Sequence, residues 1–236
     1  MSTSTSSRGC GSYVAANLFN PDHSQTASQT IPAVTVSRQT GSRGAAVCER
    51  LVTILEESNK GGENPWTLYD HDLVRQILRD HNLPEHLAQF MPDGSVSEYQ
   101  STINELLGRH PSLWSLYEDS VHTIRRLAHE GHCILVGRGG NFITKAFPQV
   151  LKVRIVGSKH RRIQEVMNRA NVSTKQAETI LRNEDNARAS YVRKHYNSDI
   201  DEPTHYDLIV NTDHLNDEAA AGLIASALCE KCQQIR

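Results

Sequence analysis

Glycine and arginine side chains between an apolar segment and a helical pattern are the residues of this sequence best suited to bind phosphate. The apolar segment ends at Ser37 and Arg38, and a helical pattern of apolar residues begins at Ala45. Glycines let the backbone approach an anion, and the start of a helix presents free N–H groups and a positive dipole end. The stretch predicts either a phosphate-binding loop or a tight turn without a ligand; the loop residues are Gly41, Ser42, Arg43 and Gly44.

This loop lacks the side chains that complete the phosphate-binding pattern G-x-x-x-x-G-K-[ST], in which lysine binds the terminal phosphates and the hydroxyl binds magnesium. If Gly44 is the last glycine, the two positions hold Ala45 and Ala46; one residue earlier, they hold Gly44 and Ala45. Arg43 and Arg38 are the nearby cations. We therefore expect Arg43 to replace the lysine, with Arg38 as the second candidate.

The composition favours a globular protein with a small-molecule ligand. The 236 residues are 38% hydrophobic and carry a formal net charge of −2, which argues against nucleic acid as a partner. No apolar run approaches the roughly 18 residues of a membrane helix, and the N-terminus does not resemble a secretory signal. Five scattered cysteines favour a reducing compartment, so a cytoplasmic location is expected. The oligomeric state is left open.

Alternating strand and helix patterns predict an α/β fold with a parallel sheet covered on both faces. Residues 1–30 are rich in Ser, Thr, Gln and Asn and are predicted to be a disordered tail. Residues 31–236 are predicted to form the folded domain, with a small helical insertion at about 82–112 and a lid region at about 158–200. The expected strands are 33–37, 66–69, 133–137, 151–156 and 206–211, of which the uninterrupted apolar run 133–137 indicates a strand buried on both faces. The main expected helices are 45–58, 113–129, 159–171, 173–196 and 216–232. Ser173 and Gln176 predict a capping box, and the last helix is expected to share one apolar face among Ala220, Leu223, Ile224, Ala227 and Leu228.

Polar residues gather where these strands end, and ligands of parallel sheets bind at that edge. Besides the loop, the strand ends carry Asp70, Arg138 and Ser158. Residues 154–194 add ten Lys or Arg against four Asp or Glu. Some of these charges can be i,i+4 pairs on an exposed helix surface, but several arginines together also suit phosphate groups. The position of the polar strand ends favours the phosphate-site interpretation.

Several segments in this order resemble the cytidylate kinase-like family of P-loop proteins: SRQTGSRG (37–44), LYDHDLVR (68–75), ILVGRGGNFI (134–143), RRIQEVMNRANVSTKQAETI (161–180), DNARASYVRKHY (185–196) and YDLIVNT (206–212). The resemblance covers about residues 32–212. It implies a P-loop NTPase-like three-layer α/β/α sandwich with a five-stranded parallel sheet. Relatives of that family are nucleoside monophosphate kinases, so it also implies an ATP-binding transferase that uses Mg²⁺.

The resemblance implies roles for individual residues. The donor nucleotide's phosphates would contact Ser37, Arg38 and the loop 41–44. The acceptor nucleotide would face Asp70, Arg75, Arg138 and Asp185, with Arg75 and Arg138 on its phosphate. The residues expected to act on the transferred group are Arg43, Arg138, Arg162 and Arg188.

Departures from the family pattern leave the acceptor open. Ala45 stands where the family usually has a basic residue, and Gly139 stands where true cytidylate kinases have an acidic one. The nucleobase therefore cannot be inferred from the resemblance. The first hypothesis is an ATP-dependent nucleoside monophosphate kinase; the alternatives are a non-catalytic nucleotide or phosphate sensor with the same fold, and a kinase of another small acceptor.

Overall fold

The computed structural model describes residues 31–59, 64–70, 113–137 and 139–235 of the chain. The predicted tail 1–30 and the predicted insertion 82–112 lie outside these ranges, so both stay predictions. Residues 31–236 form one compact unit.

The centre of this unit is a five-stranded sheet in the order β2-β3-β1-β4-β5, and every neighbouring pair of strands is parallel. The predicted α/β fold with a five-stranded parallel sheet is confirmed. The strands are β1 Ala33–Arg38, β2 Thr67–Tyr69, β3 Cys133–Val136, β4 Val150–Val156 and β5 Leu208–Asn211.

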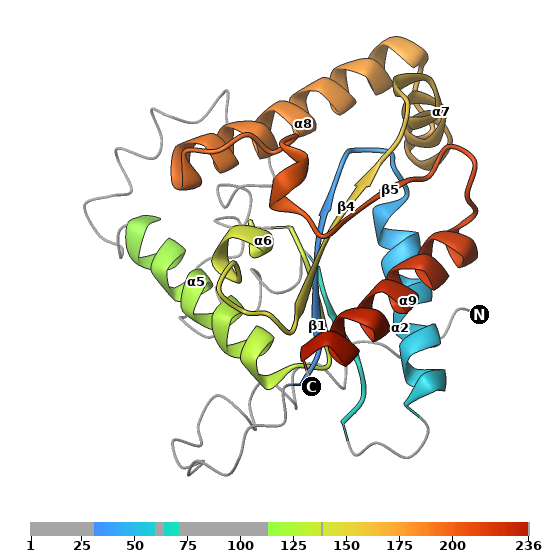
Figure 1. Cartoon of the computed structure of the whole chain (residues 1–236). Coiled ribbons are helices and arrows are strands. Elements are labelled where there is room, and N and C mark those ends of the chain that lie inside the picture. The colour runs from blue at the N-terminus through green and yellow to red at the C-terminus, as the bar shows by residue number, and fades with distance from the viewer. Residues whose placement is uncertain (1–30, 60–63, 71–112, 138, 236) are drawn as a thin grey trace, which may run out of the picture. The chain divides into compact units, whose positions relative to one another are not determined.

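Helices cover both faces of the sheet (Figure 1). The first face carries α2 and α9, which pack on each other, and the second carries α5 and α6. Within the described ranges, the two remaining α-helices are α7 and α8, which follow β4 and form a pair. The helix bounds are α2 Gly44–Ser58, α5 Leu113–Glu130, α6 Gly140–Ile143, α7 Lys159–Ala170, α8 Thr174–Tyr196 and α9 Asp217–Ile235, with a short 3-10 helix at Pro203–His205.

Strand β1 lies between β3 and β4, and five of its six residues are buried. Ala33 aligns with Cys133 on one side and with Val150 on the other. Because the three strands start level and run in the same direction, their carboxyl ends meet at one edge. That edge holds the loop between β1 and α2.

Two predicted details at the C-terminal end of the chain are wrong. Strand β5 begins at Leu208 because Tyr206 still caps the 3-10 helix before it. Leu223 was expected on the inward face of α9 but is 51% exposed. The buried stripe of α9 consists of Ala220, Ala221, Ile224 and Leu228, and Leu223 lies roughly a third of a turn from the centre of that stripe.

None of the helices within the described ranges is long and apolar enough to span a bilayer.

Candidate functional site

The loop between β1 and α2 has a compact, internally bonded backbone. Gly41 and Arg43 both adopt left-handed conformations, with φ of 74° and 59°. Ser42 N–H and Ser42 Oγ both donate to the Gln39 carbonyl, at 3.2 and 2.8 Å. A Cβ atom on Gly41 would lie 2.4 Å from the Arg162 carbonyl oxygen, so glycine is needed there for space as well as for φ.

Hydrogen bonds also fix this loop to the ends of β4 and β5. Gln39 N–H donates to the Ile155 carbonyl at 3.0 Å, and the Gln39 side-chain oxygen accepts from Gly157 N–H at 3.2 Å. The Thr212 hydroxyl donates to the Ser42 carbonyl at 3.1 Å. The loop therefore has a defined position at the carboxyl edge of the sheet, where parallel sheets bind ligands.

Arg43 is directed toward the start of α9. Its Nη2 donates to the carbonyls of Thr212 and Leu215 at 2.7 and 2.5 Å, and its Nη1 forms an ion pair with Asp217 at 3.0 Å. Arg43 is the N-cap residue of α2, but its side chain makes no capping hydrogen bond with the first N–H groups of that helix. The guanidinium thus joins the loop to the segment between β5 and α9.

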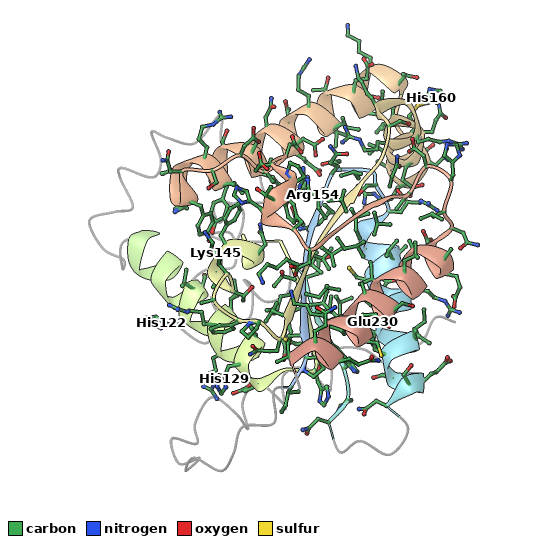
Figure 2. The ribbon with its side chains drawn as sticks, in the orientation of Figure 1. His122, His129, Lys145, Arg154, His160 and Glu230 are labelled. Carbon is green, nitrogen blue, oxygen red and sulfur yellow. The ribbon has the colours of Figure 1, made fainter. Side chains whose placement is uncertain are left out.

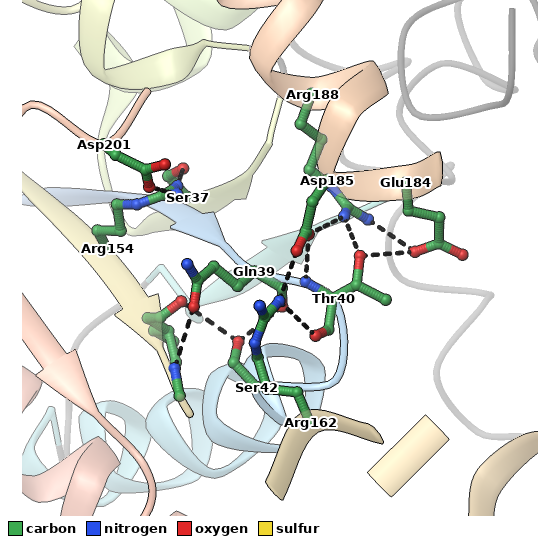
Figure 3. A network of polar contacts seen from close by, with 12 residues as sticks. Ser37, Gln39, Thr40, Ser42, Arg154, Arg162, Glu184, Asp185, Arg188 and Asp201 are labelled. Atoms are coloured by element: carbon green, nitrogen blue, oxygen red, sulfur yellow. Dashed lines mark hydrogen bonds and ion pairs between the residues drawn. The ribbon is translucent and has the colours of Figure 1, made fainter. Parts of the chain in front are cut away.

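Four charged side chains from α7 and α8 surround Thr40 in the same loop (Figure 3). We call Arg162, Glu184, Asp185 and Arg188 the Thr40 quartet. Asp185 accepts from Thr40 N–H at 2.8 Å, and Glu184 accepts from the Thr40 hydroxyl at 3.0 Å. Arg162 donates to the Thr40 carbonyl at 3.2 Å, and Arg188 donates to its hydroxyl at 2.5 Å.

The quartet is internally charge-balanced. Arg162 pairs with Asp185 at 2.5 Å, and Arg188 pairs with Glu184 at 3.2 Å and with Asp185 at 3.4 Å. The two arginine side chains are 10% and 12% exposed, whereas the carboxylates of Asp185 and Glu184 are 27% and 36% exposed. The arginines are therefore held close to the loop while solvent still reaches the carboxylates.

Helix caps set the positions of the two helices that carry the quartet. The Ser158 side chain caps α7, and the Asp213 carboxylate accepts from Ser158 N–H at 2.8 Å. That backbone hydrogen bond lowers the pKa of Asp213. Ser173 and Gln176 form the predicted capping box at the start of α8. Glu184 and Asp185 precede Arg188 by four and three residues, and this spacing puts the three side chains on one side of α8.

Arg38 lies at the end of β1, and its Nη2 forms an ion pair with Asp70 at 3.1 Å. Its side chain is 9% exposed. Arg38, Ser37 and Arg188 line a cavity. Its other walls include two glycines between β3 and α6, Gly137 and Gly139, and side chains of α8 and the segment after it, Tyr191, Val192 and Ile200. The cavity thus joins the end of β1 to the quartet.

Another buried arginine, Arg154, lies on β4 and contacts Ser37, which lines the cavity (Figures 2 and 3). It donates to Ser37 Oγ at 2.7 Å and to Asp201 at 2.5 Å, and its guanidinium lies 5.7 Å from the centre of the Tyr206 ring. Burial raises the pKa of the Tyr206 hydroxyl, which donates to the Ile200 carbonyl. The Arg154 contacts therefore tie the segment after α8 to β4 and β1.

The structure brings together most of the predicted site residues that it describes. The cavity is lined by Ser37, Arg38 and Arg188, and Arg38 pairs with Asp70. Beside the cavity lie the loop 41–44 and the ion pair of Arg162 with Asp185. Arg75 and Arg138 lie outside the described residues and stay predictions.

Sequence reasoning did not place Thr40 or Arg154 in the site, and it considered Glu184 only as an ion-pair partner on the helix surface. The only available signal for Arg154 was a cation at an inward position of the apolar segment Leu-Lys-Val-Arg-Ile-Val.

The chain matches the cytidylate kinase-like family over residues 33–214, which is more than three quarters of its length. The chain belongs to the cytidylate kinase-like family. This match confirms the resemblance drawn from the six sequence segments between residues 37 and 212. No curated protein is similar enough to match.

Solved structures of other chains are similar to this cytidylate kinase-like protein to different degrees. An uncharacterized protein from Eubacterium ventriosum ATCC 27560 has a TM-score of 0.62 and 18% identity, over 84% of this chain and 98% of that chain. Shikimate kinase from Acinetobacter baumannii in complex with shikimate has a TM-score of 0.44 and 15% identity, over 87% and 96%. Dephospho-CoA kinase from Campylobacter jejuni has a TM-score of 0.38 and 11% identity, over 87% and 98%.

Proposed function

We propose that this chain is an ATP-dependent phosphotransferase whose acceptor is a nucleoside monophosphate. The observation that carries the proposal is the convergence of the Arg162 and Arg188 guanidiniums on Thr40. Phosphoryl transfer asks the protein mainly to position its substrates and to neutralise negative charge, not to supply a nucleophile. The family match supports phosphoryl transfer in general, and the acceptor is inferred from the resemblance.

In this proposal the donor phosphates bind at the loop and replace the carboxylate of Asp185 at Thr40 N–H. A phosphate oxygen and a carboxylate oxygen both accept from an N–H group and both pair with arginine. Arg162 and Arg188 would then exchange their carboxylate partners for phosphate oxygens. The planar guanidinium suits this exchange because it can bind two oxygens at once.

Oxygen ligands for magnesium are present at the same place. Glu184 and Asp185 meet at Thr40, and Mg²⁺ in kinases is typically held by one or two carboxylates plus substrate phosphates. Within residues 31–59, 64–70, 113–137 and 139–235, no group of three or more His, Cys, Asp or Glu side chains forms a metal site without substrate. Glu184 and Asp185 would hold the ion once phosphates are bound, and the ion would neutralise phosphate charge.

The test is turnover of MgATP by the purified full chain with a panel of nucleoside monophosphates and of other small hydroxyl or phosphate acceptors. We expect ADP formation that depends on a nucleoside monophosphate. Turnover with a different acceptor alone would support the kinase of another small molecule. ATP binding by calorimetry without turnover on any acceptor would replace the proposal with the sensor hypothesis.

A further inference from the structure

The loop differs from the G-x-x-x-x-G-K pattern at both ends. It has a cation where the pattern begins with glycine, and a glycine where the pattern ends with lysine. When the pattern is placed with its first glycine at position 38, its lysine falls at position 44. This chain has Arg38 in place of that glycine and Gly44 in place of that lysine. Arg38 is the last residue of β1, and Gly44 is the first residue of α2.

The two positions compete for the same space. A Cβ atom on Gly44 would lie 2.9 Å from Arg38 Cβ and 3.1 Å from Arg38 Cγ. These atoms are at the base of the Arg38 side chain, so rotation of its far end does not relieve the contact. Gly44 is not among the described glycines with positive φ, which means that space and not backbone conformation calls for glycine. A side chain at 44 therefore requires a smaller residue at 38.

The charges on the two sides of the loop favour Arg38 as the phosphate-binding cation. Arg38 borders the cavity that also contains Arg188 and the glycines after β3. Arg43 is directed away from that cavity, toward the carbonyls of Thr212 and Leu215. The ion pair between Arg38 and Asp70 holds the guanidinium at the strand ends, where phosphates are expected.

We propose that Arg38 supplies the cation that a lysine at position 44 supplies in the G-x-x-x-x-G-K pattern, and that Gly44 makes room for it. This inference rests on the proposed function in one respect, which is that the ligand at the loop is a polyphosphate. In this assignment Arg43 positions the loop and does not contact the ligand.

The direct test measures binding of inorganic tripolyphosphate to the full chain by calorimetry. Arg38→Met removes the charge and keeps much of the side-chain volume, and we expect it to weaken binding at least tenfold. Arg50→Met is the matched control, because Arg50 is an exposed arginine of α2 whose partner is Glu218. We expect the control to bind within twofold of the wild type. Equal affinity of Arg38→Met and wild type would overturn the assignment.

A further set of three variants keeps the test decisive if Arg38→Met folds poorly because its ion pair with Asp70 is lost. Gly44→Lys should lower the melting temperature because of the contact with Arg38. Arg38→Gly should fold but lose tripolyphosphate binding, and the double variant Arg38→Gly/Gly44→Lys should recover at least part of that binding. A Gly44→Lys protein as stable as the wild type, or a double variant no better than Arg38→Gly, would overturn the proposal.

Turnover separates this inference from the proposed kinase function. If wild type binds tripolyphosphate, Arg38→Met does not, and no acceptor is phosphorylated, then the Arg38 assignment stands and the kinase function fails. If Arg38→Met phosphorylates an acceptor as well as the wild type does, the kinase function stands and the assignment fails. A wild-type chain that binds neither ATP nor tripolyphosphate overturns both.

Discussion

Arginines hold the loop 39–43 from two sides, and most of the groups that they contact differ in kind. Toward α9, Arg43 donates to two main-chain carbonyls and also pairs with Asp217. Toward α8, Arg162 and Arg188 pair with partly exposed carboxylates of the Thr40 quartet. Carbonyls of a fixed turn cannot be exchanged for a ligand, whereas carboxylate partners can be replaced by another anion. The first side is thus suited to anchoring the loop and the second to binding.

The largest effect should come from Arg188→Ala on the α8 side. If Arg188 grips a phosphate group mainly in the transition state, kcat and kcat/KM should fall together by roughly 10²-fold or more. Arg188→Lys should rescue little, because an ammonium cannot make the planar two-pronged contact. Arg182→Ala, an exposed arginine on the same helix, is the control. Loss of melting temperature with unchanged turnover per folded molecule would make Arg188 an anchor like Arg43.

Arg43→Met should act on stability instead. It leaves two loop-facing carbonyls without their donor, which costs roughly 1–3 kcal/mol, and a domain of this size loses roughly 2–4 °C of Tm for each kcal/mol. Thermal unfolding measured beside turnover on the same samples checks this. Arg50→Met, whose exposed partner is also on α9, should change Tm far less. If Arg43→Met abolished tripolyphosphate binding at unchanged Tm, Arg43 would be the replacement for the lysine after all.

Asp185→Asn should strengthen the binding of an external anion. The variant keeps the shape of the side chain but removes the negative charge that competes at Thr40 N–H. We expect tripolyphosphate to bind about tenfold more tightly, or about 1.4 kcal/mol. Calorimetry with Glu178→Gln as the control tests this, since Glu178 lies on the same helix and pairs with Lys159. Weaker binding by Asp185→Asn would show that its carboxylate holds the arginines in place and does not compete.

The smallest expected effect is a pH dependence on the α8 side. Burial, with help from Lys194, lowers the pKa of His195 below its ordinary value of 6.5. The unfolded chain therefore binds a proton more readily, so this contribution to stability is present above pH 6.5 and is lost as pH falls through the folded-state pKa. His195→Gln should flatten the fall in Tm between about pH 6.5 and 5. An unchanged slope would assign the acid sensitivity to other groups.

Local patterns predicted most of the fold because the signals lie within short segments. The apolar segment Cys133–Val136 indicated a buried strand, and Ser173 with Gln176 indicated the start of a helix; both are confirmed. Leu223 shows the limit of such patterns, since a helix with apolar residues around much of its surface does not reveal which side is buried.

The candidate site was less predictable because its contacts join distant parts of the chain. Thr40 bonds to Asp185, 145 residues away, and nothing in either segment alone indicates this pairing. Arg43 was predicted to bind phosphate because it lies inside the loop, but the direction of its side chain depends on the carbonyls of Thr212 and Leu215. Types and positions of site residues could be predicted, and so could the pairing of Arg188 with a carboxylate on its own helix, whereas partners from distant segments could not.

The central place of β1 in the sheet has a consequence for synthesis of the chain. Ala33 aligns with Cys133 and Val150, which follow it by 100 and 117 residues. At roughly 5–20 residues per second, a ribosome needs about 5–20 seconds to add the first of these partners. During that time the apolar segment Ala33–Val36 has neither of its neighbouring strands, and unpaired apolar strands favour aggregation. Substitutions that add a charge to β1 should therefore change the yield of folded protein as well as its stability.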